Sequence, residues 1–359
     1  MPGTLEQGAL LRVAVVGVGA FGRNHVRVYR ELQRARLGVE LVAVVDRDAA
    51  VAARVGAEFG VPGFATIAAC LAGVSGLDAA SVCVPTVHHA AAAVELLAAG
   101  VDVLIEKPLA GTLEDADRIL AAAGEYGRVV QVGHLERFNP AVTAVREYLN
   151  KPMFFEAHRL SVFTPRSLDV DVVLDLMIHD LDIVLSLVAS TVREVRAVGL
   201  AVLSRKVDIA NVRLEFENGC IANFTASRVS TERVRKLRFF QPHQYLSLDF
   251  ARQDVLLIDV TGAAGLSEAE LAVLVGQTGA DQHPSEGLSM RKLGVAAGEP
   301  LRLELESFVG AVRGRLRPVV SGEDGRAALA LALEINAAIA AHAARTGLDG
   351  MPVSAWSGR

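Results

Sequence analysis

The chain has 359 residues, of which 52% are apolar and 21% charged, so it is long enough to form two domains with sizeable cores. Its 41 acidic and 36 basic residues leave a formal net charge of −5 with no long basic block, which argues against a nucleic-acid partner. Cys70, Cys83 and Cys220 lack disulfide or zinc spacing and fit a reducing cytoplasm.

The start of the chain carries its clearest pattern. The first ten residues lack a basic start followed by an apolar core, so no secretory signal is expected. An apolar run then leads into a G-x-G-x-x-G pattern, which between a strand and a helix is typical of a dinucleotide-binding turn. An acid ends the next predicted strand, where a carboxylate would bind the adenosine ribose and repel a 2′-phosphate, so NAD is expected rather than NADP. The residues expected to contact NAD here are Gly17, Gly19, Ala20, Phe21, Gly22, Asp46 and Arg47, of which Arg47 would soften the preference for NAD.

Strands and helices alternate over the next segment. Helices are predicted at 48–59, 88–99 and 113–125, and strands at 79–84, 101–105 and 128–132. Two further strands are predicted at 13–16 and 40–45, on either side of a helix at about 20–36. This gives five strands in a doubly wound parallel sheet, the α/β arrangement of a Rossmann domain. Ligands bind such sheets at the carboxyl ends of the strands. Further cofactor contacts are therefore expected from Pro85, Thr86, His89, Glu106 and Lys107.

The pattern changes after the fifth strand. Helices are predicted at 141–149 and 172–188, and strands at 153–160, 192–203, 209–217, 220–227, 234–240, 245–249 and 255–260. Asn218-Gly219 is a strong hairpin signal. We expect an α+β domain with a large, mostly antiparallel, open-faced sheet, whose uncovered face would pair subunits into a homodimer or homotetramer. The segment 262–299 has no clear pattern, and helices return at 301–315 and from 324 onward.

Two domains follow from these patterns: a NAD-binding Rossmann domain over 1–134, and a substrate-binding and oligomerisation domain over 135–359. The apolar segment 327–344 is broken by Glu334, Asn336 and His342. It is predicted to be an amphipathic helix rather than a membrane span, so no membrane partner is expected.

Two groups of residues have the chemistry of a dehydrogenase. Lys107 follows a buried-looking strand and would polarise a substrate oxygen, although strand-end lysines are often only solvated. Asp175 and His179 are spaced i and i+4, so that the carboxylate would orient the imidazole as a general base. The same spacing is common in surface pairs. It also permits a metal pair, but with no third ligand in view no metal is expected.

A polar turn follows the fifth strand, at the junction of the two domains. We interpret this turn either as a substrate-binding element or as an interdomain salt-bridge turn. The substrate-binding candidates, including one from the polar connection 164–171, are His134, Glu136, Arg137, Asn139, Arg166, Asp175 and His179.

Together these motifs resemble the glucose-fructose oxidoreductase, inositol dehydrogenase and MocA (Gfo/Idh/MocA) family over nearly the whole chain. The motifs that carry the resemblance are the glycine turn, Pro85 with His89, Glu106-Lys107-Pro108, Arg137-Phe138-Asn139-Pro140, Asp175 with His179 and Asp182, Glu304-Leu305-Glu306-Ser307-Phe308, and Gly322-Glu323-Asp324-Gly325. The resemblance implies that His179 takes the hydroxyl proton while hydride passes to the nicotinamide, that Lys107 polarises the same oxygen, and that Asp175 orients the substrate.

The substrate implied by the resemblance is less uniform. Many members carry glycines where this chain has Asp169-Val170-Asp171 and Met177. The motifs around residues 133–140 and 169–180 are similar to a branch that oxidises the 3-hydroxyl of UDP-N-acetylglucosamine. The alternatives are an inositol or free-aldose dehydrogenase, or a non-catalytic NAD-sensing regulator. A nucleotide sugar would bring a diphosphate, for which the candidates, alternatively a solvated sheet face, are Arg228, Arg233, Arg235, Lys236 and Arg238.

Overall fold

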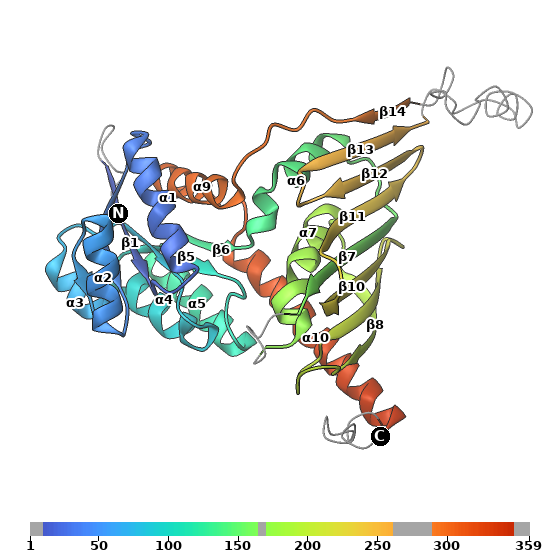
Figure 1. The fold of residues 1–359 in the computed structure, drawn as a ribbon, viewed down its shortest axis with the longest axis horizontal. Coiled ribbons are helices and arrows are strands. Elements are labelled where there is room, and N and C mark those ends of the chain that lie inside the picture. Colours follow the sequence, from blue (N-terminus) through green and yellow to red (C-terminus); the bar gives the residue numbers. More distant parts are fainter. Residues whose placement is uncertain (1–9, 164–169, 261–288, 348–359) are drawn as a thin grey trace, which may run out of the picture. The chain divides into compact units, whose positions relative to one another are not determined.

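The computed structural model describes residues 10–163, 170–260 and 289–347. The chain forms two compact units, one comprising Met1–Phe138 with Gly298–Ala330 and the other Asn139–Ala297 with Leu331–Arg359 (Figure 1). Each unit contains one sheet. The expected α/β Rossmann domain followed by an α+β domain is confirmed.

The N-terminal unit is built on a parallel sheet with strand order β3-β2-β1-β4-β5-β6. Most residues of its longer strands are buried, as expected when helices cover both faces of a parallel sheet. The strands are β1 (Leu11–Val16), β2 (Val39–Val45), β3 (Gly63–Phe64), β4 (Ala79–Val82), β5 (Asp102–Glu106) and β6 (Val130–Gly133).

Helix α2 (Ala49–Phe59) begins and ends at capping residues. Asp48 accepts hydrogen bonds from the amides of Ala50 and Val51 at the start of α2, and Gly60 ends it with a left-handed φ of 66°. The helices are α1 (Gly22–Arg34), α2 (Ala49–Phe59), α3 (Ile67–Gly73), α4 (His89–Ala98) and α5 (Leu113–Tyr126), with short turns η1 (Thr86–His88) and η2 (Leu135–Phe138).

The prediction of five strands was one too few. The two-residue strand β3 and helix α3 lie between the predicted helix at 48–59 and the predicted strand at 79–84, where we expected neither a strand nor a helix. A strand of two residues is too short to show an alternating hydrophobic pattern. It lies against the preceding helix, because a Cβ on Gly63 would be 2.3 Å from the carbonyl oxygen of Ala52.

Residues 298–330 belong to the N-terminal unit, which therefore is not one continuous segment. Helix α9 (Pro300–Gly314) places Leu305 and Phe308 in the same core cluster as Val13 and Tyr29. This differs from a single change of domain after residue 134. Hydrophobic periodicity shows that a late helix is buried but not which core it joins.

The second unit is built on an eight-stranded sheet with order β14-β13-β12-β11-β7-β10-β9-β8, antiparallel except where β7 pairs with β10. Burial alternates along the central strands, so one face is buried and the other is open. The strands are β7 (Phe154–Val162), β8 (Val192–Leu200), β9 (Ile209–Phe216), β10 (Ile221–Ser230), β11 (Val234–Gln241), β12 (Gln244–Asp249), β13 (Asp254–Asp259) and β14 (Ser289–Lys292).

Helices α6 (Pro140–Val145) and α7 (Ile178–Val188) lie on the buried face (Figure 1). A 3-10 turn, η3 (Arg146–Tyr148), follows α6. The long helix α10 (Gly322–Thr346) contributes its first part to the N-terminal unit and its remainder to this one.

Among the described helices, α10 is long and apolar enough to span a membrane by length and composition alone. Core helices of globular proteins pass the same test. Leu329, Ala332 and Ile335 are fully buried within the protein, and Asn336 donates a hydrogen bond to Asp171 at 3.1 Å. These contacts are those of a core helix.

Candidate functional site

The glycine turn of the N-terminal unit is built by backbone geometry. Gly17 has a φ of 84°, and a Cβ there would lie 2.6 Å from the amide nitrogen of Val84 at the end of the neighbouring strand. A Cβ on Gly22 would lie 1.8 Å from the carbonyl oxygen of Gly17. Both positions therefore require glycine. Around Gly19, by contrast, a Cβ would meet nothing within 4 Å, so the space beside this turn is open to a ligand.

The acid predicted to bind the ribose is tied directly to this turn. Asp46 Oδ2 accepts a hydrogen bond from the amide of Val18 at 3.0 Å, and Oδ1 accepts one from Asp48 at 3.0 Å. Asp46 is half-buried, whereas Arg47 beside it is exposed, as are Ala20 and Phe21 on the turn. The structure thus brings the turn and the carboxylate together.

The ends of β4 and β5 are connected through a buried histidine. The two ring nitrogens of His89 lie 2.9 Å from the carbonyl oxygens of Val84 and Pro108. Burial is the main cause that lowers the pKa of His89. Pro108 follows Lys107 through a cis peptide bond. His89 therefore holds the two loops at this edge, with Pro85 exposed and Thr86 half-buried in the turn before it.

Sequence reasoning left His25 without a role. In the structure it is fully buried on α1, and its Nε2 lies 3.0 Å from Oε1 of Glu106. Glu106 ends β5, directly before the half-buried Lys107. Only the position of His25 three residues after the last glycine of the turn could have signalled that it faces the sheet.

The polar turn after β6 is buried. His134, Glu136 and Arg137 are at most 7% exposed, and Arg137 donates a hydrogen bond to the carbonyl oxygen of Val319 at 3.1 Å. Asn139 begins the second unit, where its Oδ1 caps α6 and its Nδ2 donates to the carbonyl oxygen of Phe250 at 3.0 Å. The Asn139 side chain thus has a structural part, and its substrate contact stays a prediction.

In the second unit, Asp175 and His179 lie at the start of a helix, as predicted, but the first turn is not α-helical. Asp175 lies in a π-helical turn, η4 (Val173–Met177), and His179 lies in the first turn of α7. Both side chains are half-buried. Asp171 Oδ1 accepts hydrogen bonds from the amides of Val173 and Leu174 at 3.0 Å and so fixes where this turn begins. Turns of this kind are frequent at functional sites.

Two buried ion pairs hold this region. Arg159 on β7 donates two hydrogen bonds of 2.8 Å to Asp180, the residue after His179. Arg228, one of the candidates for a diphosphate, is buried and lies 3.1 Å from Asp208. Arg228 therefore has a structural ion pair, whereas Arg233, Arg235, Lys236 and Arg238 are exposed, which leaves both interpretations of the remaining cations open.

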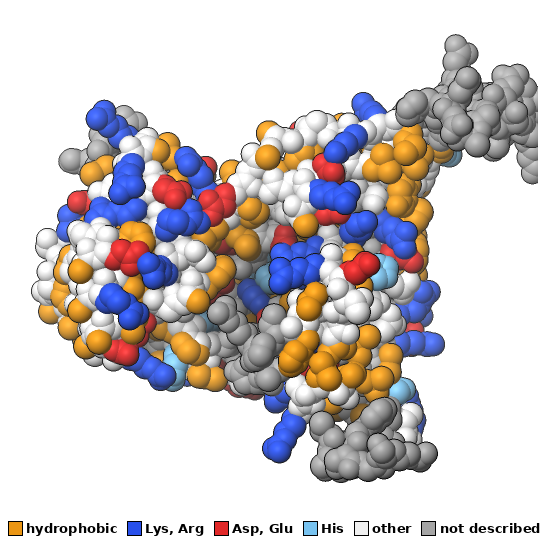
Figure 2. All heavy atoms as spheres, viewed as in Figure 1, with side chains coloured by type: hydrophobic (Ala, Val, Ile, Leu, Met, Phe, Trp, Pro, Cys, Tyr) orange, Lys and Arg blue, Asp and Glu red, His pale blue; other side chains and the backbone are white. Residues whose placement is uncertain are grey.

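Arg166 lies outside the described residues. Within the described ranges, no group of three or more His, Cys, Asp or Glu side chains could hold a metal ion. On the visible face of the N-terminal unit, basic and acidic side chains are interspersed (Figure 2).

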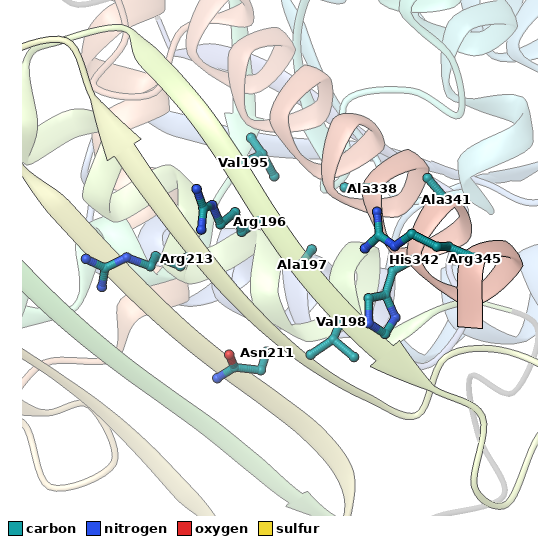
Figure 3. Close-up of a pocket in the computed structure, with 10 residues that line it drawn as sticks. All are labelled: Val195, Arg196, Ala197, Val198, Asn211, Arg213, Ala338, Ala341, His342 and Arg345. Carbon is teal, nitrogen blue, oxygen red and sulfur yellow. The ribbon is translucent and has the colours of Figure 1, made fainter. Parts of the chain in front are cut away.

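A hollow of about 610 Å³ lies between β8 and α10 and contains none of the predicted site residues. Its arginines do not converge, since Arg196 and Arg213 point away from α10 (Figure 3).

These features fit a dinucleotide. The open space at Gly19 admits phosphates to the exposed turn at the start of α1, and the half-buried Asp46 beside it offers acceptors for ribose hydroxyls. The residues of the N-terminal unit can thus hold the nucleotide, and those at the end of β5 lie on the same edge of the sheet.

Comparison with known proteins agrees with this description. Residues 11–134 match the Gfo/Idh/MocA oxidoreductase family with an NAD-binding Rossmann fold, and residues 118–241 match the Gfo/Idh/MocA C-terminal domain. UDP-N-acetylglucosamine 3-dehydrogenase from Acidithiobacillus ferrooxidans is 35% identical over 92% of this chain and 98% of its own length. The solved structure of that enzyme matches with a TM-score of 0.80 over the same shares.

Two further relatives are less similar. Inositol 2-dehydrogenase from Acidothermus cellulolyticus is 32% identical over 52% of this chain and 56% of its own length. The WlbA dehydrogenase from Bordetella pertussis, solved in complex with NADH and UDP-GlcNAcA, shares the fold with a TM-score of 0.71 at 18% identity, over 92% of this chain and 96% of its own. The extent of the first match and of the family domains shows that the chain belongs to the Gfo/Idh/MocA family of oxidoreductases, as a sugar dehydrogenase.

Proposed function

We propose that the protein oxidises the 3-hydroxyl of UDP-N-acetylglucosamine to the 3-keto sugar with NAD. The observation that carries this proposal is the 35% identity to an enzyme of that name over nearly the full length of both chains. The inositol dehydrogenase match covers about half of either chain, so a free polyol or aldose is the second candidate.

NAD is proposed over NADP because of Asp46. Its carboxylate lies beside the glycine turn and is fixed by two backbone amides. A 2′-phosphate at the ribose would bring like charges together. Gly17, Gly19, Ala20, Phe21, Gly22 and Arg47 would surround the phosphates and ribose, and Pro85, Thr86, His89, Glu106 and Lys107 would lie toward the nicotinamide.

The catalytic proposal assigns one step to each side chain. The nicotinamide supplies the acceptor for the hydride that leaves the sugar carbon. His179 accepts the proton of the sugar hydroxyl, so that the C–O bond becomes a carbonyl. The Lys107 ammonium donates to the same oxygen and stabilises the negative charge that develops on it. Asp175 orients the substrate, with His134, Glu136, Arg137, Asn139 and Arg166 as further substrate contacts.

We also propose that subunits pair through the open face of the eight-stranded sheet. Phe240 is 38% exposed on this face and makes tilted ring contacts with Phe154 and Tyr245 at centroid distances of 5.6 and 4.9 Å. Exposed aromatic clusters of this kind are typical of subunit interfaces. The three cysteines are free, which supports the proposed location in a reducing cytoplasm.

The test is the absorbance of NADH formed when the purified protein and NAD are mixed with UDP-N-acetylglucosamine, myo-inositol or glucose, each with a ketone trap. A signal with the nucleotide sugar alone is the expected result. A signal with myo-inositol or glucose alone would contradict the substrate assignment. Formation of NADPH at an equal rate from NADP would contradict the assignment of Asp46.

A further inference from the structure

His25 connects the helix of the glycine turn to the strand that carries Lys107. It lies on α1, is fully buried, and its Nε2 is 3.0 Å from Glu106 Oε1. Its ring also lies edge-on to Phe21 at a centroid distance of 5.4 Å. Neither the family motifs nor the catalytic proposal uses this residue.

The proton on the His25 ring can be placed from its hydrogen bonds. An ionised carboxylate only accepts hydrogen bonds, so the proton lies on Nε2. Nδ1 is buried, and none of the described residues forms a hydrogen bond with it. The ring therefore donates from Nε2 to the carboxylate, and this hydrogen bond fixes where the carboxylate lies.

Glu106 also has contacts with the backbone. Oε2 accepts a hydrogen bond from the amide of Lys107 at 3.3 Å. A Cβ on Gly133 would lie 2.8 Å from Oε1, so the carboxylate rests against bare backbone at the end of β6. The Glu106 side chain is only 13% exposed. A fixed, poorly hydrated carboxylate thus lies at the carboxyl ends of β5 and β6, the edge where ligands bind such sheets.

We propose that His25 is a positioning residue that holds the Glu106 charge at the cofactor edge, and that this charge strengthens the binding of NAD⁺ relative to that of NADH. The inference rests on the proposed use of NAD. The nicotinamide ring is cationic when oxidised and neutral when reduced, so a nearby fixed anion stabilises only the oxidised form. Hydrogen bonds to the sugar, phosphates and adenine are common to both forms and do not change the ratio.

The test measures the dissociation constants of NAD⁺ and NADH for the wild type and three variants. Glu106→Gln keeps the shape of the side chain and removes its charge. His25→Leu removes the donor, whereas His25→Gln places an N–H near the position of Nε2. We expect the ratio of the NADH to the NAD⁺ dissociation constant to fall about tenfold in Glu106→Gln and about threefold in His25→Leu. In His25→Gln it should stay near the wild-type value.

Thermal unfolding of each variant shows whether it folds. If His25→Leu does not fold, the ratios measured for Glu106→Gln and His25→Gln decide the test. Equal weakening of both cofactor forms, with an unchanged ratio, would mean that His25 and Glu106 only maintain packing and would overturn the inference. Binding of neither form by the wild type would instead overturn the proposed function, and this inference with it.

Discussion

Two regions of the protein place polar groups for chemistry in different ways. In the N-terminal unit, the glycine turn is shaped by close backbone contacts, such as that between Gly22 and the carbonyl oxygen of Gly17. In the second unit, the turn that carries His179 is held by side chains from distant segments, including Arg159 on β7 and Asn336 on α10. The first region is shaped by close backbone packing, and the second depends on side-chain contacts between distant segments.

This difference decides how each region should respond to substitution. Adding a single methyl group can disrupt a site defined by backbone contacts, whereas loss of one partner leaves a buried charge uncompensated in a site held by ion pairs.

The largest expected effect comes from the two proposed catalytic side chains, one in each unit. Lys107→Met or His179→Asn should lower turnover of UDP-N-acetylglucosamine by about 10²–10⁴-fold, because each removes a group that acts on the reacting oxygen. The dissociation constant for NAD should change little in His179→Asn, which equilibrium titration measures alongside turnover. Full activity in either variant would refute that residue's assignment.

The ion pair beside His179 tests the second region. Arg159→Met should lower the free energy of unfolding by about 3–5 kcal/mol, because Asp180 would keep its charge in a buried position. Arg193→Met, which removes the exposed partner of Glu215 at 3.2 Å, is the matched control and should cost at most about 1 kcal/mol. Denaturant unfolding measures the free energy of unfolding of both variants. Equal losses would show that the buried pair contributes no more to stability than the exposed pair.

Two glycines test the first region. Gly22→Ala should lower the free energy of unfolding by about 1–3 kcal/mol, because its Cβ would overlap the carbonyl oxygen of Gly17. Gly19→Ala has open space around its Cβ and should change stability by less than about 0.5 kcal/mol. It should still weaken NAD binding, since the methyl group would occupy the side where phosphates approach. A stable Gly22→Ala variant would show that the helix can shift.

The smallest expected effect concerns cofactor preference. Asp46→Asn should reduce the preference for NAD over NADP by about tenfold, because one negative charge near the 2′-position is lost. Asp48→Asn is the control, since asparagine also caps helices and the change removes a neighbouring charge. The ratio of kcat/KM for the two cofactors is the measurement. An equal effect of both variants would point to net charge rather than to Asp46.

The parts of the fold that could be predicted are those set by local sequence. The glycine turn, Asp46 at the end of β2 and the alternating strands of the second sheet each depend on residues a few positions apart. The π-helical turn at Asp175 was not predicted, because its residues have ordinary helical periodicity and the hydrogen bonds of Asp171 fix only where the turn begins.

The candidate site was predictable in composition but not in environment. Nothing in the sequence indicates that His25 meets Glu106, since their contact spans 81 positions. Likewise, Arg228 belonged to a run of cations, and only the fold shows that it pairs with Asp208. Long-range pairing of buried charges depends on topology, which hydrophobic patterns do not specify.

The contribution of residues 298–330 to the N-terminal unit affects when this unit can finish folding during synthesis. Leu305, Phe308 and Val312 complete the core around the first strands, although they lie far along the chain. A nascent chain that has emerged only as far as the end of the second sheet still exposes the apolar surface of β1 and α1 that these residues cover. The dinucleotide-binding unit, encoded first, therefore finishes folding only after the ribosome has translated most of the second unit.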